Sequence, residues 1–310
     1  PQCRRKKMLE WAAYFRPQTE RIIIMNLTAR REAYRAILEG DKCVHPGSVF
    51  DAISARIAED VGFEVMMFAG SIASATVLGA PDYIVLTQTE FAQQIHRICR
   101  AGTLPLMVDS DHGYGNALNV KRTVEELETA GVAALTIEDT LLPRGFGSSS
   151  PELISIEEGV GKMKAALAGR QDTSLVVAGR TSACAIEGLE EGIRRAKAYQ
   201  EVGVDALFFA GGINSVDDLA AIRSEISIPI LMGGGGGALG DREILASHGV
   251  RVALQGHMPF MASVKATYDT LKALRDGVAP SDLGNQPSSD LIAQVTRLAE
   301  YDDDTEQFLN

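Results

Sequence analysis

Short apolar runs alternate with longer segments of helical periodicity along most of the chain. Each run is rich in Val, Ile, Leu and Phe and stops at a polar residue or a glycine, which is typical of a buried strand. The pattern predicts eight strands, near residues 42–46, 64–69, 105–108, 133–137, 175–178, 206–210, 229–232 and 251–254.

The segments between these runs predict amphipathic helices, for example over residues 48–62, 119–131 and 188–203, each closed by a glycine. Strands that are apolar throughout and alternate with helices indicate a parallel sheet covered by helices. A doubly wound open sheet and a closed (β/α)8 barrel of the TIM type both fit this order. The number of strands and the lack of a topological break favour the barrel.

The two ends of the chain depart from the pattern. Residues 1–26 are basic with an interrupted apolar patch, so we expect an N-terminal extension outside the domain, a targeting peptide being the alternative. Residues 27–278 are predicted to form the barrel. Residues 279–310 are predicted to be a linker, a helix and an acidic tail.

Composition restricts the partners of this domain. A formal net charge of −11 argues against nucleic acid or an anionic membrane, because both require a basic surface. The apolar runs are far shorter than the roughly 20 residues that span a bilayer. The 4 cysteines lack CxxC spacing and suggest no zinc site. We therefore expect a cytoplasmic protein that binds a small molecule or another protein.

Polar residues and glycines gather directly after the predicted strands, where parallel barrels carry their chemistry. They are Gly70, Ser71, Asp109, Asp111, Glu138, Asp139, Arg180, Thr181, Gly211, Gly212, Gly233 to Gly237, Gly256 and His257. If the barrel is closed, these residues converge on one rim.

Three carboxylates on this rim predict a metal site. Asp109 and Asp111 follow one strand and Glu138 ends the next, which gives the oxygen-rich ligand set that suits Mg²⁺ or Mn²⁺. Asp139 is an alternative to Glu138, since the pattern does not say which of the two points inward. A helix cap and a solvated carboxylate are the structural alternative for the aspartates.

Arg180 and His257 are the candidates for contact with a substrate. A guanidinium at the rim can bind a substrate carboxylate through two parallel hydrogen bonds, or it can pair with one of the rim carboxylates. His257 follows both a strand and a glycine, a combination that suits hydrogen bonding or proton transfer. His45 and His112 are second choices.

The run Gly233 to Gly237 has three interpretations: a phosphate cradle, a flexible lid, or a backbone that passes close to another subunit. No nucleophile is supported, because Ser71, Ser74 and Thr181 have no evident histidine–carboxylate partners in the sequence.

Several motifs resemble one enzyme family. The segments AGSIASATVLGAPDYIVLT, DSDHGYGNALNVKRTVEELETAGVAALTIEDTLLP and AGRTSA are similar to the phosphoenolpyruvate mutase/isocitrate lyase superfamily over residues 27–278. HGYGNALNV, ALTIEDTLLP, EEGVGK and the GH ahead of KATYD resemble its oxaloacetate decarboxylase branch.

The resemblance implies roles for particular residues. It implies Asp109 as the carboxylate associated with Mg²⁺, with Asp111, Glu138 and Asp82 completing the metal shell, largely through water. It also implies that Ser71 cradles the substrate carboxylate and that Arg180 and His257 contact the substrate. The superfamily's barrels exchange a helix between subunits and form dimers of dimers, which implies a homotetramer.

Two departures from the superfamily's motifs bear on the reaction. The segment LLPRGFGSSSPE lacks the catalytic cysteine of the enzymes that cleave isocitrate, and Gly233 to Gly237 replace a tyrosine-containing stretch of the decarboxylase branch. We expect a Mg²⁺-dependent lyase that converts oxaloacetate, a 2-oxo dicarboxylic acid, to pyruvate and CO₂ through a metal-stabilised enolate. The alternatives are a phosphonopyruvate-type P–C bond enzyme (a mutase or hydrolase), a substituted-malate C–C lyase, and a barrel without catalysis that binds a ligand.

Overall fold

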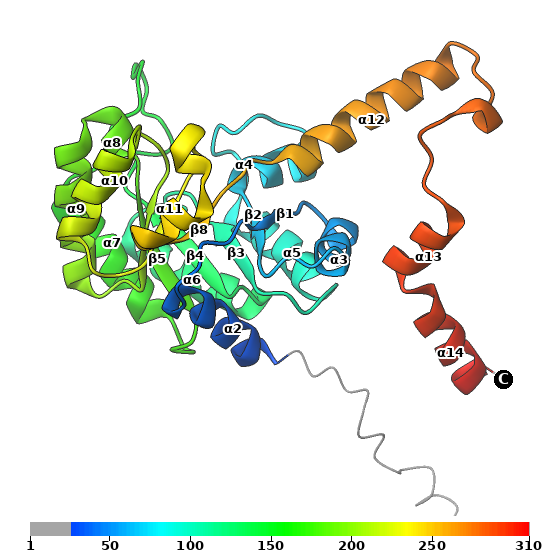
Figure 1. Ribbon diagram of the computed structural model, residues 1–310, viewed down its shortest axis with the longest axis horizontal. Helices are drawn as coiled ribbons and strands as arrows, with labels where there is room; N and C mark the ends of the chain where they lie inside the picture. The colour runs from blue at the N-terminus through cyan, green and yellow to red at the C-terminus, as the bar shows by residue number, and fades with distance from the viewer. Residues whose placement is uncertain (1–25, 310) are drawn as a thin grey trace, which may run out of the picture.

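The apolar runs form eight parallel strands in the computed structural model, which describes residues 26–309 (Figure 1). Each strand pairs with the next one along the chain, which confirms the predicted (β/α)8 architecture. The strands are β1 Gly47–Ser48, β2 Met66–Phe68, β3 Leu106–Asp109, β4 Ala134–Glu138, β5 Val176–Thr181, β6 Ala206–Phe209, β7 Ile230–Met232 and β8 Val250–Ala253.

Helices alternate with these strands and surround them. The α-helices are α2 Leu27–Glu39, α3 Ala52–Asp60, α4 Gly70–Ala73, α5 Gln88–Cys99, α6 Ala117–Ala130, α7 Ile156–Gly169, α8 Ala183–Ile186, α9 Leu189–Val202, α10 Val216–Glu225, α11 Arg242–Ser247, α12 Met258–Arg275, α13 Ser289–Thr296 and α14 Leu298–Leu309. Three short helical segments are η1 Ser74–Leu78, a π-helix, and the 3₁₀ turns η2 Gly237–Gly240 and η3 Pro280–Asp282.

Burial on both faces explains why the strands are apolar throughout. All residues of β2, β4 and β6 are buried, because one face packs inside the barrel and the other against the helices. The glycines predicted to end helices do so: Gly131 and Gly203 follow α6 and α9 in the left-handed conformation. Helix α3 ends two residues before Gly62, at Asp60.

The sheet closes between its first and last strands through Val44. The Val44 N–H donates to the carbonyl of Arg251 at 2.9 Å, and the Ala253 N–H donates to the carbonyl of Val44 at 3.0 Å. These two bonds form the seam of the barrel.

The prediction of a first strand over residues 42–46 is wrong in its bounds. Pro46 has no N–H to continue a ladder, so the regular strand β1 begins at Gly47, whose N–H reaches the carbonyl of Val65 at 2.9 Å.

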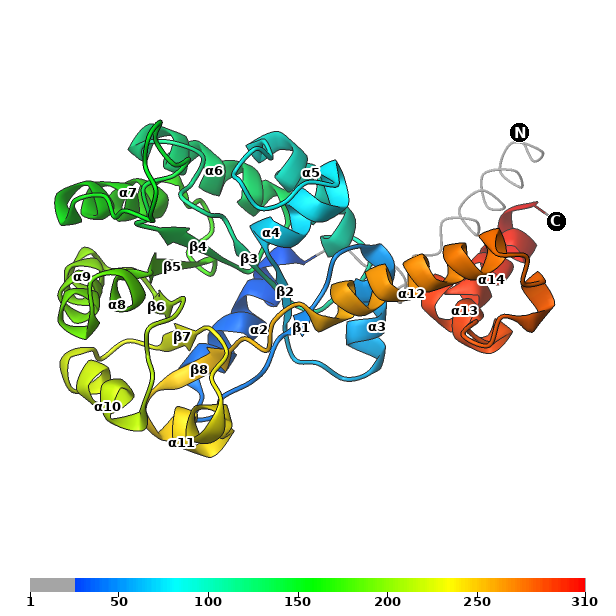
Figure 2. The ribbon, with the colours of Figure 1, turned by 90° about the horizontal axis from the view of Figure 1, so that it is seen from above.

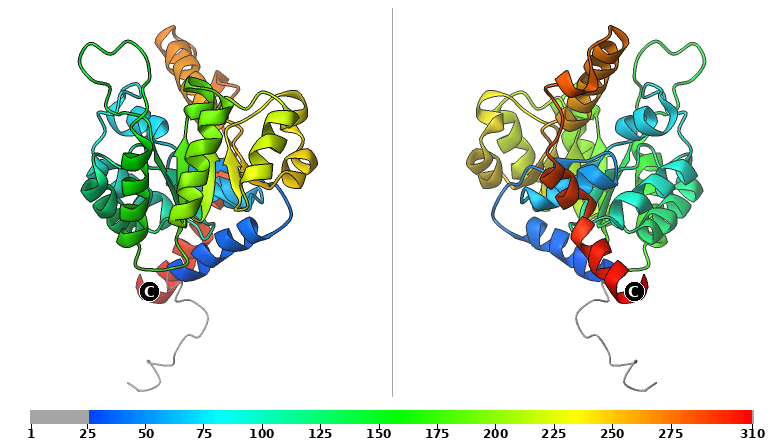
Figure 3. Two further views of the ribbon diagram at one scale, coloured as in Figure 1. Left: turned by 90° about the vertical axis from the view of Figure 1, so that its left-hand side faces the viewer. Right: turned by 90° about the vertical axis from the view of Figure 1, so that its right-hand side faces the viewer.

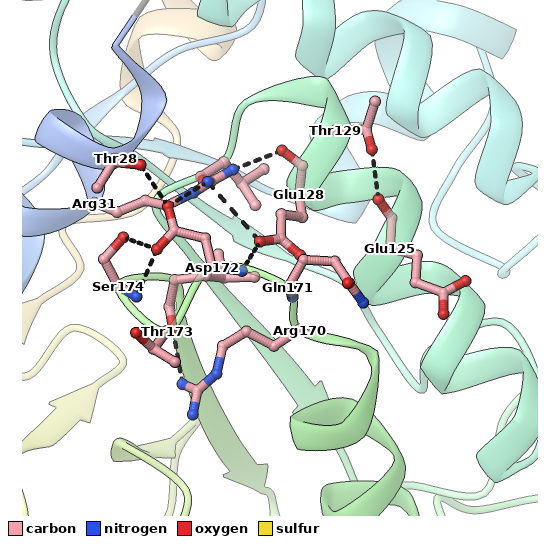
Figure 4. Close-up of polar contacts among 12 residues, drawn as sticks. Thr28, Arg31, Glu125, Glu128, Thr129, Arg170, Gln171, Asp172, Thr173 and Ser174 are labelled. Atoms are coloured by element: carbon pink, nitrogen blue, oxygen red, sulfur yellow. Dashed lines mark hydrogen bonds and ion pairs between the residues drawn. The ribbon is translucent and has the colours of Figure 1, made fainter.

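Helix α2 lies across the end of the barrel opposite the loop between β4 and α7, which stands above the carboxyl ends of the strands (Figure 3). Arg31 of α2 is 5% exposed and binds Asp172 at 2.8 Å, the carbonyl of Glu128 at 2.7 Å and that of Val132 at 3.2 Å (Figure 4). The Glu128 carboxylate accepts hydrogen bonds from the N–H groups of Gln171 and Asp172 at 2.8 and 2.6 Å. Arg31, Glu128 and Asp172 thus form a network beneath the strands, called the lower network here, in which each charged group has an oppositely charged or polar partner.

Helix α12 extends away from the barrel (Figure 2). The chain then turns back and α13 packs against α3, where Arg56 donates to the carbonyls of Val295 and Thr296 at 3.3 and 3.0 Å. Arg297, the residue after α13, pairs with Asp60 of α3 at 2.7 Å. Two helices stand where one was expected, and the acidic residues Asp302 to Asp304 belong to α14. Of the predicted N-terminal extension, residues 1–25 lie outside the described residues, and Asn26 caps α2.

Candidate active site at the carboxyl ends of the strands

The two aspartates of the DSD motif flank a tight turn at the end of β3. Asp109 is the last residue of the strand, and its carboxylate accepts hydrogen bonds at 3.2 Å from the Asp111 N–H and from the Thr136 hydroxyl. Asp111 has φ +48°, in the left-handed region, and is 8% exposed. Both carboxylates therefore stay at the rim, one on the strand and one on the turn.

The structure separates Glu138 from Asp139. Glu138, 4% exposed, accepts a hydrogen bond from the Thr140 hydroxyl at 2.8 Å and lies 3.5 Å from Arg180. Asp139 is completely buried and binds Arg195 and Tyr199 of α9 instead, at 3.1 and 2.7 Å. Glu138 is therefore the member of the pair that shares the site with Arg180, and Asp139 ties β4 to the helix layer.

Arg180 of β5 joins these carboxylates. One end of its guanidinium is bonded to Asp109 and the other lies against Glu138, while the Phe208 ring of β6 is 5.6 Å away. Its Nε–H is buried and has no hydrogen-bond partner among the described residues. The ion pair considered as the structural alternative is thus formed, and one buried donor of the guanidinium stays available to a ligand.

Negative charge exceeds positive charge here. Burial raises the pKa of Asp111 well above its usual value, and the charges of Asp109, Glu138 and Asp82 raise it further. Burial also raises the pKa of Glu138, although Arg180 opposes that shift. The pKa of Arg180 is raised because Asp109 and Glu138 outweigh the effect of its own burial. One guanidinium does not neutralise the group.

Ser71 and Asp82 approach this cluster from the segment after β2. Helix α4 starts at Gly70, and a Cβ added there would lie 2.6 Å from a carboxylate oxygen of Asp111, so only glycine fits beside that side chain. Ser71 is the next residue and stands at the same edge. Partial burial and the charge of Asp109 raise the pKa of Asp82, which lies in the loop after η1.

His257 reaches the site from the loop after β8. Its Nδ1 lies 2.9 Å from the Ser48 hydroxyl of β1. Burial lowers its pKa, and the charge of Asp109 opposes that shift. His45 is turned to the carbonyl of Ala253 at 2.8 Å, and His112 is buried with a pKa lowered to about 4, mainly by burial. His257 is thus the histidine electrostatically linked to the carboxylate group.

These carboxylates do not form a ready-made metal cage. Within residues 26–309, no group of three or more His, Cys, Asp or Glu side chains is spaced to hold a metal ion. Arg180 accounts for this spacing, because its guanidinium lies between Asp109 and Glu138. The surplus of buried carboxylate nevertheless fits a hard divalent cation, because such cations prefer oxygen ligands.

Comparisons with known proteins identify the family of the chain. The sequence profile of the family described as phosphoenolpyruvate phosphomutase matches residues 35–275. The chain belongs to this family. The superfamily predicted from the motifs is thereby confirmed.

Relatives within and around the family are similar over nearly their whole length. The chain is 57% identical over 276 residues to a protein of Bradyrhizobium sp. strain BTAi1 named oxaloacetate decarboxylase, covering 89% of this chain and 96% of the relative. The structure of phosphoenolpyruvate phosphomutase from Streptomyces platensis subsp. rosaceus has a TM-score of 0.80 at 26% identity, over 90% of this chain and 99% of that one. The structure of phosphonopyruvate hydrolase in complex with oxalate and Mg²⁺ has a TM-score of 0.77 at 26% identity, over 91% of this chain and 99% of that one.

Close packing accounts for most of the glycine run in this family member. Added Cβ atoms at Gly233, Gly234 and Gly235 would lie 2.7, 2.6 and 2.6 Å from the Ala210 carbonyl, the Leu254 carbonyl and the Leu239 side chain. Neighbouring segments of the same chain therefore leave room only for glycine at these three positions.

Two residues beside the site, Ser48 and Tyr114, were not predicted from the sequence. Ser48 positions His257, and its only signal was its place at the start of a predicted helix. The Tyr114 hydroxyl is buried without a partner among the described residues, and burial and the charge of Asp111 raise its pKa. The HGYG motif contains Tyr114, but its position relative to the carboxylates requires the folded turn.

None of the helices that the structure describes has both the length and the apolar composition needed to cross a lipid bilayer.

Proposed function

We propose that the chain is a lyase that decarboxylates a 2-oxo dicarboxylic acid, converting oxaloacetate to pyruvate and CO₂. The observation that carries the proposal is the excess of buried carboxylate around Arg180 at the carboxyl ends of the strands. The relative named oxaloacetate decarboxylase, 57% identical over 276 residues, supports the choice of substrate.

The carboxylates are proposed to hold Mg²⁺, with Mn²⁺ as a substitute. Asp109 is the main ligand, and Asp111, Glu138 and Asp82 contribute largely through water, because Mg²⁺ keeps several waters and takes few direct carboxylates. When bound, the cation supplies charge stabilisation for an enolate. The solved phosphonopyruvate hydrolase that contains Mg²⁺ and oxalate is consistent with such a site.

Arg180, Ser71 and His257 are proposed to orient the substrate. The buried Nε–H of Arg180 offers a hydrogen bond to a substrate carboxylate, and the Ser71 segment receives the carboxylate next to the keto group. His257, held by Ser48, donates from its second nitrogen to a substrate oxygen. Cleavage of the C–C bond leaves its electron pair in the enolate and releases CO₂, and a proton from water then completes pyruvate.

A second candidate is a phosphonopyruvate-type P–C bond enzyme, a mutase or a hydrolase, on the same site. The likeness to the solved phosphonopyruvate hydrolase, at 26% identity and a TM-score of 0.77, favours it. A substituted-malate C–C lyase also fits these carboxylates. Release of phosphate, or of a 2-oxo acid from a substituted malate, distinguishes these reactions from decarboxylation.

We further propose a cytoplasmic homotetramer whose residues 27–278 form the catalytic barrel and whose C-terminal helices assemble it. Helix α12 buries none of its residues within the described chain and exposes Met261, Tyr268 and Leu271 at 54, 65 and 62%. Such a row of apolar side chains suits exchange of the helix between subunits. Light scattering on the purified protein tests this assembly, and a monomer would contradict it.

The test of the activity starts from metal-stripped protein. Pyruvate formation from oxaloacetate is measured with and without Mg²⁺, against an enzyme-free control that contains the same metal, because the free ion can itself assist the reaction. Activity that needs both protein and Mg²⁺, disappears in Arg180→Met and persists in Arg122→Met, at an exposed position of α6, supports the proposal. Turnover no faster than the enzyme-free control contradicts it.

A further inference from the structure

The turn that carries Asp111 has an unfavourable backbone. Asp111, Gly113, Tyr114 and Gly115 all have positive φ angles, of +48, +76, +60 and +148°. Glycine adopts such angles readily, but aspartate and tyrosine carry a Cβ and prefer other conformations. The surrounding structure must therefore hold this turn in place.

Three consecutive carbonyl groups of the turn are held by three different elements. The carbonyl of Asp111 accepts from the Glu138 N–H of β4 at 2.9 Å. The carbonyl of His112 accepts from the ammonium of Lys162 in α7 at 3.0 Å, and that of Gly113 from the hydroxyl of Thr123 in α6 at 3.1 Å. Two of these three contacts are made by side chains outside the proposed ligands.

Burying the Lys162 ammonium to make such a contact costs free energy. Its side chain is 2% exposed, and burial of an ammonium is unfavourable unless nearby charge compensates for it. Burial lowers its pKa, while the charges of Glu158, Glu138 and Asp139 oppose that shift. The bond to the His112 carbonyl is therefore made despite a desolvation cost, which the nearby carboxylates partly offset.

We propose that Lys162 is a positioning residue of the cation site, acting with Thr123. It holds the peptide after Asp111 in the left-handed turn, which keeps the Asp111 carboxylate against Gly70 and facing the rim. This inference rests on the proposed function, because it takes Asp111 as part of a cation site.

The test is the affinity for Mn²⁺, measured by calorimetry on the metal-stripped full chain. Lys162→Met removes the ammonium and keeps the length of the side chain. We expect its Kd to rise about 10- to 100-fold, the usual effect of losing a partner that orients a ligand. Lys164→Met, at an exposed position of the same helix, is the matched control and should change Kd by less than about twofold.

The outcomes separate the two proposals. Wild-type protein that does not bind Mn²⁺ overturns the cation site, and the positioning role with it. Tight binding by the wild type and equal binding by folded Lys162→Met, checked by circular dichroism, overturns the positioning role alone. If Lys162→Met fails to fold, Thr123→Val decides, because it removes the α6 hydroxyl that binds the Gly113 carbonyl of the same turn. A rise in its Kd of about two- to tenfold supports the proposal, and an unchanged Kd overturns it.

Discussion

The two ends of the barrel differ in whether their buried charges are balanced by groups of opposite charge. At the lower end, Arg31 has carboxylate and carbonyl partners, and Glu128 accepts two backbone N–H groups (Figure 4). At the upper end, the guanidinium of Arg180 is the positive group that faces Asp109, Asp111 and Glu138. Burial raises the pKa of Asp111 and that of Glu138. The lower network is thus matched internally, and the upper cluster lacks positive charge.

This difference indicates that the lower network contributes to folding stability and the upper cluster to chemistry. A matched network needs no ligand and fixes α2 beneath the strands. An unmatched cluster costs stability by itself, which a protein tolerates where the missing charge is supplied by a bound ion or substrate. Substitutions at the two ends should therefore affect different measurements.

The largest contrast is expected in catalysis. Arg180→Met should lower kcat/KM for oxaloacetate about 10²- to 10³-fold, because the donor aimed at the developing charge is lost. Arg31→Met should leave kcat/KM within about twofold, since it lies at the opposite end of the barrel. Pyruvate formation below the melting temperature of both variants measures this, and equal losses would remove the distinction between the ends.

The next contrast is in folding stability. Arg31→Met should lower the free energy of unfolding by about 3–5 kcal/mol, because it leaves Asp172 and two carbonyls without their buried cation. Urea unfolding of the metal-free protein measures the change. Arg122→Met, whose side chain pairs only at the surface, serves as the control and should lose less than about 1 kcal/mol.

Neutralising one carboxylate at each end should give opposite signs. In metal-free protein, Asp111→Asn should raise the free energy of unfolding by about 1 kcal/mol, because it relieves repulsion with Asp109 and Glu138. Glu128→Gln should lower it by about 1–3 kcal/mol, since one buried N–H loses its charged acceptor. Destabilisation of both variants to the same extent would mean that the upper carboxylates are as well matched as the lower ones.

The smallest contrast concerns pH. Hydrogen bonds from Ser174, Arg31 and Thr28 outweigh burial and hold the pKa of Asp172 below its ordinary 3.8. Its stabilisation is therefore full above about pH 4 and is lost as the pH falls toward its folded pKa. The pKa of Asp111 is raised, so its ionisation destabilises the metal-free fold as the pH rises above the ordinary value.

Unfolding free energies of wild type, Asp172→Asn and Asp111→Asn between pH 3 and 7 check these signs. The gap between wild type and Asp172→Asn should shrink toward acid, and the advantage of Asp111→Asn should grow toward neutrality. A gap that does not change with pH at either position contradicts the assignment for that end.

Much of the fold and the rim could be predicted because both depend on local pattern. Apolar runs mark strands buried on both faces, and the residues after them are brought to one end by parallel pairing. Asp109, Glu138 and Arg180 were found this way, and the structure brings them into contact.

The remaining features depend on direction and on contacts between distant segments. Adjacent carboxylates such as Glu138 and Asp139 face opposite sides of a strand, and sequence spacing does not fix which is inside. Lys162 belongs to a helix of ordinary composition, and only the packing of α7 behind the turn brings it to His112. Pro46 could have signalled the late start of β1, since proline interrupts a ladder.

The seam at Val44 gives the barrel a place where it should open first. Neighbouring strands from β2 to β8 are joined by ladders of three or more paired residues, for example the five pairs between β4 and β5. At the seam, both main-chain bonds depend on Val44. Deuterium should accordingly replace the amide hydrogens of Val44 and Ala253 sooner than those inside β4 and β5, so that the cylinder opens and recloses along one line while the rest stays protected.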